Sequence, residues 1–115
     1  MDSKFSHIDN KGNARIVNIS KKKKSLRYAK AQATVWLSNK ILAMIKNDEF
    51  KKGNVINVAR IAGIMGAKQT SSLIPLCHNI SLDSSEINFR FLEEDLEIVS
   101  IVQSEEKTGV EMEAL

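Results

Sequence analysis

The sequence predicts an α+β fold in which helices cover one face of an antiparallel sheet. Three observations support this class: a long stretch of strict period-two alternation, two segments of helical periodicity after it, and two short alternating segments joined by an acidic turn. An element order of this kind buries its apolar side chains by packing helices against one side of the sheet. With 115 residues, one domain around one core is the expectation.

The start of the chain combines polar side chains with an Asp-Asn-Lys-Gly turn. We therefore expect residues 1–13 to form a mobile N-terminal arm and residues 14–115 to form a single domain. Ala14–Ser20 is rich in β-branched residues and predicts a short strand. The basic run Lys21–Lys24 follows it. Its simplest interpretation is a solvated hairpin turn, and a binding patch for an anion is the alternative.

The next segments predict one strand and two helices. Arg27–Leu37 alternates small apolar and polar residues, which favours a half-buried strand whose alanine face lets a helix pack closely. Ser38 can cap a helix that ends at Asn47. Asn54 begins a second helix, expected to reach about Ser71. Apolar residues nearly encircle that helix, so we expect it to be central.

The second predicted helix contains two glycines, Gly63 and Gly66. Glycine costs a helix roughly 1 kcal/mol relative to alanine. Two of them therefore suggest that another backbone or a ligand comes close to this helix.

The last third of the chain predicts an antiparallel hairpin and the beginning of a third helix. The segment 87–91 and the segment Leu96–Gln103 alternate as strands, and Glu93–Asp95 turns the chain between them. Glu111–Leu115 has helix-forming residues after Gly109. Five residues cannot sustain a helix by themselves, so we expect the sequence to stop within an element.

Charge is divided unevenly along the chain. Residues 1–68 carry a net charge of +11, and residues 69–115 carry −8. The basic half fits an anionic partner, and mutual neutralisation of the two halves is the alternative. The single cysteine, Cys77, excludes an internal disulfide and predicts a reducing compartment such as the cytoplasm. We expect neither a signal peptide nor a membrane span, because the apolar stretches are too short.

Several motifs that suggest a function lack features that the function requires. Lys107–Thr108 resembles the end of a phosphate loop but lacks its glycines. Cys77 and His78 are too few for a structural zinc site, and neighbours in an extended segment point apart, so a nucleophilic pair is disfavoured. A small RNA-binding module is also disfavoured, because six aromatic residues provide no stacking platform.

Charged residues of the second predicted helix remain as binding candidates. Asn57, Arg60 and Lys68 fall within an arc of about 80°. The two cations among them, Arg60 and Lys68, either extend to solvent or bind an anion. His78 follows the same helix and can share a pocket with Lys68; an imidazole suits proton transfer near neutral pH. The carboxylates of Glu111 and Glu113 either favour the helix dipole or accept hydrogen bonds from a purine or pterin edge.

Taken together, these segments resemble the cyclic pyranopterin monophosphate synthase family, the MoaC type of molybdenum cofactor biosynthesis. The resemblance runs from Phe5 to Leu115 and is strongest over 59–78 and 107–115, where the chain reads KTGVEMEAL. It implies a ferredoxin-like fold and a homohexamer built as a trimer of dimers. It also implies a lyase that converts 3',8-cyclo-7,8-dihydroguanosine 5'-triphosphate to a cyclic pterin monophosphate, with loss of pyrophosphate and without a cofactor.

The resemblance also assigns roles to individual residues. Lys52 matches a lysine implicated in catalysis, His78 a hydrogen-bonding or proton-transfer group, and Glu111 a residue that orients the substrate or a catalytic lysine. The segments that match substrate-binding positions are Leu76, Cys77, His78, Met112 and Glu113. Arg60 and Lys68 are our own candidates for the triphosphate, because they share a helical edge.

The chain departs from the family pattern at several positions. Gln69 stands in place of arginine, Asn79 in place of proline, and Glu105-Glu106 in place of Thr-Gly. The family's last helix and strand, with the aspartate and lysine of an Asp-Met-Cys-Lys motif, lie beyond Leu115, so we expect a C-terminally truncated chain. A catalytically impaired relative that binds nucleotide or joins complete subunits is therefore the alternative to an active synthase.

Overall fold

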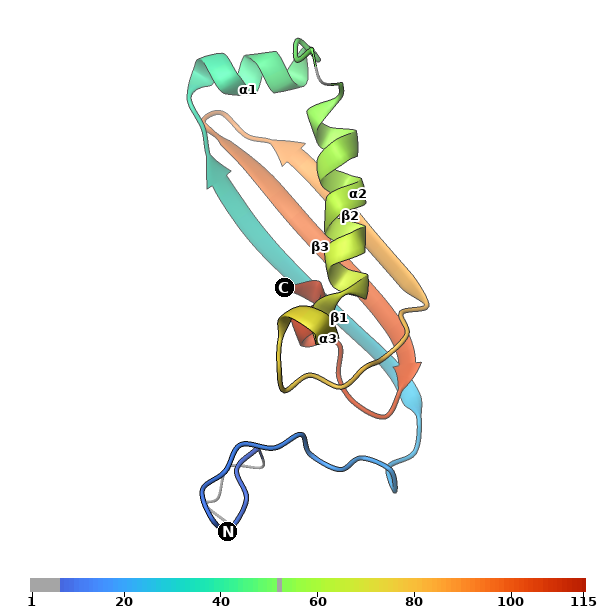
Figure 1. The fold of residues 1–115 in the computed structure, drawn as a ribbon. Helices are drawn as coiled ribbons and strands as arrows, with labels where there is room; N and C mark the ends of the chain where they lie inside the picture. Colours follow the sequence, from blue (N-terminus) through green and yellow to red (C-terminus); the bar gives the residue numbers. More distant parts are fainter. Residues whose placement is uncertain (1–6, 52) are drawn as a thin grey trace.

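The computed structural model describes residues 7–51 and 53–115. It contains one three-stranded antiparallel sheet, in the order β1-β3-β2, with helices on one side (Figure 1). The elements in chain order are β1 (Ser25–Trp36), α1 (Asn39–Lys46), α2 (Val55–Lys68), α3 (Thr70–Leu73), β2 (Ser84–Phe91), β3 (Asp95–Glu106) and α4 (Glu111–Ala114). The α+β class is confirmed, and the strand–helix–strand–strand–helix order is that of a ferredoxin-like chain.

The long strand β1 forms where the alternation predicts it. It pairs with β3 along its whole length, from Ser25 opposite Glu106 to Trp36 opposite Asp95. Alternate side chains point to opposite faces, so Ala29 and Ala31 face the helices and pack against the buried core. That core consists of Ala67, Val102, Val110 and Ala114. Small side chains on both sides therefore bring α2 and α4 close to the sheet, as expected.

The two longer helices begin at the predicted caps. The Ser38 hydroxyl accepts a hydrogen bond from the Ile41 amide at 3.2 Å, and Leu42 and Ile45 are buried. The Asn54 side chain accepts from the Asn57 amide at 2.8 Å. Such a cap satisfies one of the free amides at the helix start. Helix α2 ends at Lys68, and the chain continues through the short helix α3 to Leu73 before Pro75.

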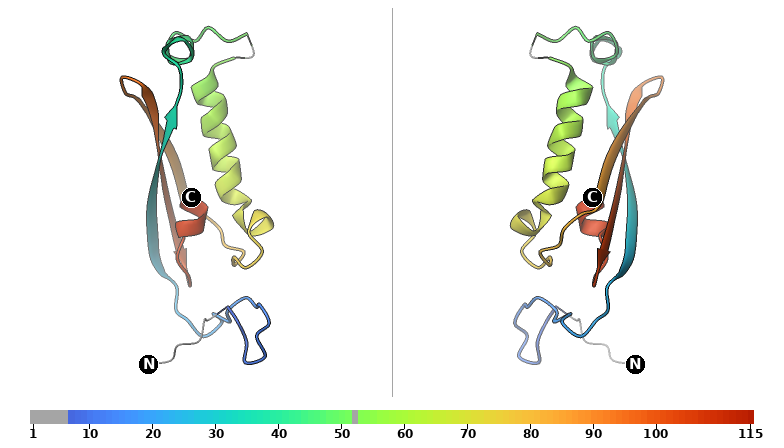
Figure 2. Two further views of the ribbon diagram at one scale, coloured as in Figure 1. Left: turned by 90° about the vertical axis from the view of Figure 1, so that its left-hand side faces the viewer. Right: turned by 90° about the vertical axis from the view of Figure 1, so that its right-hand side faces the viewer.

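The position of α2 differs from the expected central one. Figure 2 shows α2 and α4 on the same side of the sheet, with α2 at the outside of the molecule. Ala67 is its one buried residue, while Val58, Ile61 and Met65 are each more than half exposed. The apolar residues encircle α2, but among the described residues no element covers its outer face. A ring of apolar residues thus did not predict where this helix lies.

The two glycines of α2 have different surroundings. A side chain at Gly63 would overlap the end of the Ile87 side chain on β2, whereas Gly66 faces open space. A close approach is therefore present at Gly63 alone, and it is made by a side chain of the sheet, not by the backbone or ligand that the two glycines suggested.

The segment Ala14–Ser20 is not a strand, in contrast to the prediction. Its only β-pairing is an isolated bridge between Ile8 and Ala14. Strand preference depends on packing against neighbouring strands, and no described strand lies alongside this segment. Strand β3 instead extends to Glu106, three residues beyond the predicted end. No helix in the described part of the chain is long and apolar enough to cross a membrane.

Candidate active site

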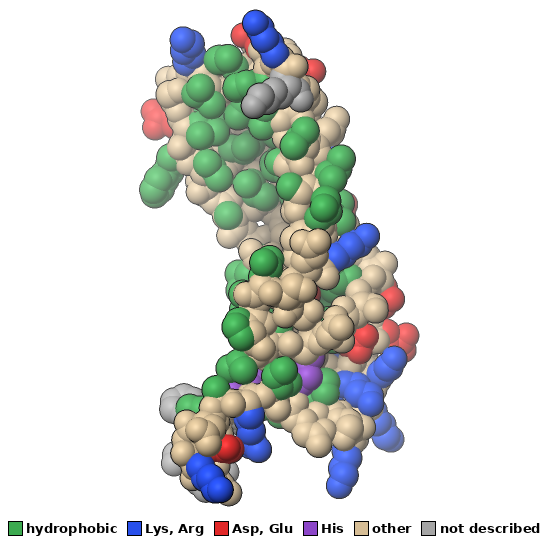
Figure 3. Space-filling model, viewed as in Figure 1, with side chains coloured by type: hydrophobic (Ala, Val, Ile, Leu, Met, Phe, Trp, Pro, Cys, Tyr) green, Lys and Arg blue, Asp and Glu red, His purple; other side chains and the backbone are tan. Residues whose placement is uncertain are grey.

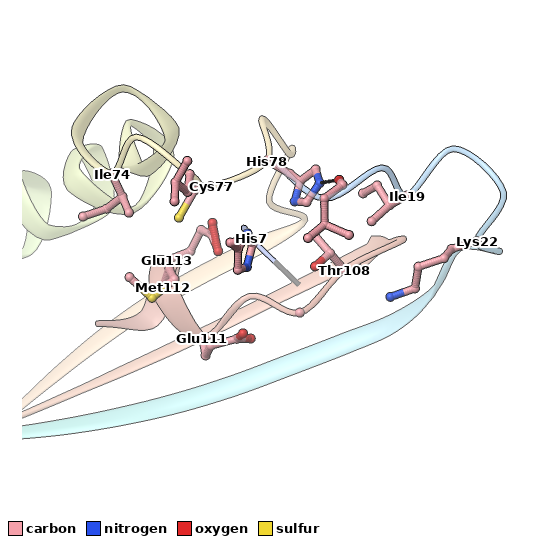
Figure 4. Close-up of a pocket in the computed structure, with 13 residues that line it drawn as sticks. His7, Ile19, Lys22, Ile74, Cys77, His78, Thr108, Glu111, Met112 and Glu113 are labelled. Atoms are coloured by element: carbon pink, nitrogen blue, oxygen red, sulfur yellow. Dashed lines mark hydrogen bonds between the residues drawn. The ribbon is translucent and has the colours of Figure 1, made fainter. Parts of the chain in front are cut away.

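A cavity of about 370 Å³ lies where three segments of the chain meet (Figure 4). One wall is the loop after α3, and a second is α4 with the loop before it. The third is the segment 7–24 before β1, which is longer than the predicted arm of residues 1–13 and to which the term N-terminal arm applies from here on. The lining residues are His7, Val17, Ile19, Lys22, Ile74, Leu76, Cys77, His78, Thr108, Gly109, Glu111, Met112 and Glu113. The volume falls in the range of small-molecule sites, which lies at roughly 300–1,000 Å³.

The loop that carries Leu76, Cys77 and His78 is held at both ends. At its start, the Ile74 amide donates to the Thr70 carbonyl at 2.8 Å, and the Cys77 amide donates to the Ile74 carbonyl at 3.2 Å. At its end, the Ser71 hydroxyl donates to the Asn79 side chain at 3.3 Å. Backbone turns and a side-chain hydrogen bond thus place this loop at the cavity.

His78 is fixed by the arm. Its Nε2 lies 2.6 Å from the Val17 carbonyl oxygen. A carbonyl oxygen only accepts hydrogen bonds, so this geometry requires Nε2 to carry the hydrogen. The other nitrogen, Nδ1, is then the ring nitrogen that can accept a hydrogen bond from a ligand.

Helix α4 brings two carboxylates to the cavity. The backbone of α4 is held in the core by Val110 and Ala114, which are buried. Glu113 is only 8% exposed, and burial raises the pKa of its carboxyl group, with a further contribution from the negative charge of Glu111. Gly109 leaves room for the Glu111 carboxylate, which a side chain at that position would overlap.

Cys77 lies near these carboxylates with a protonated thiol. Burial raises the pKa of Cys77, and the charges of Glu113 and Glu111 raise it further. The thiolate is the nucleophilic form. Cys77 is therefore a weak nucleophile that contributes a neutral surface to the cavity.

The structure brings six of the candidate residues to one cavity. These are Leu76, Cys77, His78, Glu111, Met112 and Glu113. Their convergence could not be read from residue spacing, because the two segments lie more than thirty positions apart. Lys52 lies outside the described residues, as do Phe5 and Ser6 of the resemblance.

The two cations assigned to the triphosphate do not line this cavity. Arg60 donates from Nε to the Ile87 carbonyl at 3.0 Å and from Nη1 to the Asn57 side chain at 3.2 Å. Its guanidinium also lies over the ring of Phe89, 5.4 Å from the ring centre. These contacts attach Arg60 to β2. Lys68 is exposed at the end of α2 and does not share the cavity with His78.

Sequence reasoning missed three polar residues of the cavity: His7, Lys22 and Thr108. The basic run at 21–24 was the one signal for Lys22, and a solvated turn was its simpler interpretation. Nothing in the local pattern indicated that the arm folds back against α4.

This fold and this cavity define a small α+β protein with a site for a small polar ligand, lined by carboxylates, imidazoles and one lysine. The chain belongs to the MoaC family, whose model matches residues 16–115. The family match covers the segments 76–78 and 111–113, which carry the candidate site residues.

Named relatives are similar over the whole chain. Proteins called cyclic pyranopterin monophosphate synthase from Clostridium perfringens and Natranaerobius thermophilus are 48% and 45% identical to it, over all of this chain and 74% of their own length. Molybdenum cofactor biosynthesis protein 1 of Drosophila melanogaster is 44% identical over 98% of this chain and 20% of its own length.

Proposed function

We propose that this chain is a cyclic pyranopterin monophosphate synthase of molybdenum cofactor biosynthesis. The reaction is that of a lyase, in which 3',8-cyclo-7,8-dihydroguanosine 5'-triphosphate is converted to the cyclic pterin monophosphate and pyrophosphate is released. Membership of the MoaC family and the names of its relatives support this proposal. The single structural observation that carries it is the cavity shared by the segments 76–78 and 111–113.

The cavity suits the base of a guanine-derived nucleotide. Glu113 and Glu111 present acceptor oxygens, and a guanine or pterin edge presents N–H donors. Hydrogen bonds to a carboxylate are stronger than neutral ones, and they gain strength where water is excluded. We therefore assign the heterocycle to the α4 side of the cavity, beside Met112 and Cys77.

His78 is the residue best arranged to move a proton. Its Nε2–H is committed to the Val17 carbonyl, so the ring orientation is set before substrate binds. Nδ1 then serves as the site of proton exchange, and Glu111 orients the substrate. A positioned imidazole of this kind contributes typically 10²–10⁴-fold to a rate.

The remaining roles belong to the same proposal. Lys52 is a catalytic lysine by resemblance, and Arg60 and Lys68 remain predicted contributors to phosphate binding, for which the cavity geometry provides no support. We also propose that the protein works as a homohexamer, with its site near a subunit boundary, and that it works in the cytoplasm, where Cys77 stays reduced.

A turnover assay tests the proposal. The purified chain is given the cyclised triphosphate, and pyrophosphate and cyclic pterin product are both measured. We expect turnover that His78→Ala lowers by at least about a hundredfold. Asn88→Ala, an exposed change on β2 away from the cavity, is the matched control and should keep full activity. Equal turnover of both variants would remove His78 from the chemistry, and failure of the unaltered chain to bind the substrate would contradict the proposed function.

A further inference from the structure

The third wall of the cavity is a segment that neither the resemblance nor the helix pattern assigned to the site. Four residues of the N-terminal arm line it: His7, Val17, Ile19 and Lys22. Two side chains from the domain hold this segment. His78 contacts the Val17 carbonyl at 2.6 Å, and the Lys107 ammonium donates to the Ser20 carbonyl at 3.3 Å. These hydrogen bonds therefore fix the arm in place as one wall of the cavity.

Local hydrogen bonds direct the Lys22 side chain. The Lys22 amide donates to the Ile19 carbonyl at 3.0 Å, and the Ser20 amide donates to the Asn18 side chain at 2.9 Å. The resulting turn lies just after the point that Lys107 holds. Figure 4 shows Lys22 reaching from the arm into the cavity toward Thr108. Its neighbours in the basic run do not line the cavity.

The cavity thereby has two electrostatically different sides. Glu111 and Glu113 enter from α4, and Lys22 enters from the arm (Figure 4). Among the described residues that line the cavity, Lys22 is the only lysine or arginine. A ligand with N–H donors at one end and negative charge at the other matches this division, and a nucleoside triphosphate has that form.

We propose that Lys22 binds the phosphate chain of the substrate. This inference rests on the proposed function, because it takes the ligand to be a nucleoside triphosphate derivative. The ammonium group donates charge-assisted hydrogen bonds to phosphate oxygens. Because Lys22 is exposed in the absence of ligand, it needs no costly burial of an unpaired charge. Phosphate binding then comes from the arm and base binding from the domain.

The test compares two lysines of the same basic run. Calorimetric titration measures the affinity of the whole chain for GTP and for guanosine, with Lys22→Ala and Lys24→Ala as variants of equal charge. We expect Lys22→Ala to weaken GTP binding about tenfold, the loss of one charge-assisted contact near solvent. Guanosine affinity should stay unchanged, Lys24→Ala should stay within about twofold for both ligands, and Lys22→Arg should recover most of the GTP affinity.

The outcomes separate this inference from the proposed function. If the unaltered chain binds neither GTP nor the cyclised triphosphate, the proposed function fails and the inference fails with it. If the unaltered chain binds and Lys22→Ala binds equally well, only the inference fails. Equal losses in Lys22→Ala and Lys24→Ala would also overturn it, because they would show a general effect of charge. Circular dichroism of both variants checks that the fold is retained.

Discussion

At the scale of single residues, Glu113 combines burial with a neighbouring negative charge. Its carboxyl group is 8% exposed, and burial raises its pKa above the usual value of about 4.5, with Glu111 adding to the shift. The folded state therefore holds the Glu113 proton more tightly than the unfolded state does. Stability must then fall as the pH rises through the interval between the unfolded and the folded pKa.

Replacing Glu113 with glutamine should remove this pH-dependent loss of stability. Glutamine has nearly the same shape and no charge, so the free energy of unfolding of Glu113→Gln should fall less than that of the unaltered chain as the pH rises from 4.5 toward neutrality. Urea unfolding at a series of pH values measures the difference. Glu86→Gln makes the same chemical change at an exposed position of β2 and should follow the unaltered chain. A difference between Glu113→Gln and the unaltered chain that is constant across this range would contradict a raised pKa.

The sequence predicted residues and segments that belong to the site, but it did not predict how they are arranged in space. Resemblance selected His78, Glu111 and Glu113, and the cavity brings them together. The His78 ring is fixed by the hydrogen bond that its Nε2 donates to the Val17 carbonyl, sixty-one positions earlier in the chain. A contact of that kind depends on how the arm folds back, which no local periodicity encodes. Because the position of the arm could not be predicted, the simplest interpretation of Lys22 was a solvated lysine.

At the scale of elements, the contact between α2 and β2 depends on a glycine. Gly63 faces the end of the Ile87 side chain, which is 7% exposed and has little room to move. Gly63→Ala should therefore destabilise the fold by roughly 1–3 kcal/mol through overpacking, partly offset by about 1 kcal/mol of helix preference.

Gly66→Ala is the matched substitution one turn along the same helix. It faces open space, so it should stabilise the protein by roughly 0.5–1 kcal/mol. Urea midpoints of the two variants measure the contrast. Equal stability of the two would show that Ile87 moves aside freely and that close packing does not explain Gly63.

The elements that the sequence predicted are those in which local pattern and packing agree. Strand β1 alternates and is paired along its whole length, and α1 and α2 begin at Ser38 and Asn54 as their caps require. Ala14–Ser20 has β-branched residues but no neighbouring strand in the described structure, so it stays irregular. Strand β3 extends beyond its predicted end because its partner β1 begins at Ser25, which pairs with Glu106.

At the scale of the whole molecule, the chain is extended and exposes much surface. Its radius of gyration is 18.1 Å, whereas a compact domain of this length has about 13 Å. Its accessible surface is 8694 Å², against about 6,300 Å² for a compact monomer of its mass. Figure 3 shows hydrophobic side chains along α2 and over the part of the sheet below α1 that α2 leaves uncovered. Contiguous exposed apolar side chains are typical of interfaces.

This surface predicts that the protein self-associates. The total accessible surface, polar groups included, exceeds that of a compact monomer by about 2,400 Å², and a standard interface buries roughly 800 Å² of each partner, so the chain has room for more than one contact. Sedimentation velocity over a range of concentrations should show assemblies rather than a 12.9 kDa species. Ile61→Glu places a charge among the exposed apolar residues of α2 and should shift the distribution toward smaller species. Leu92→Glu makes a comparable change at the β2–β3 turn, away from α2, and should shift it less. A single monomeric species at all concentrations would contradict the assembly, and equal shifts in the two variants would remove the outer face of α2 from its interface.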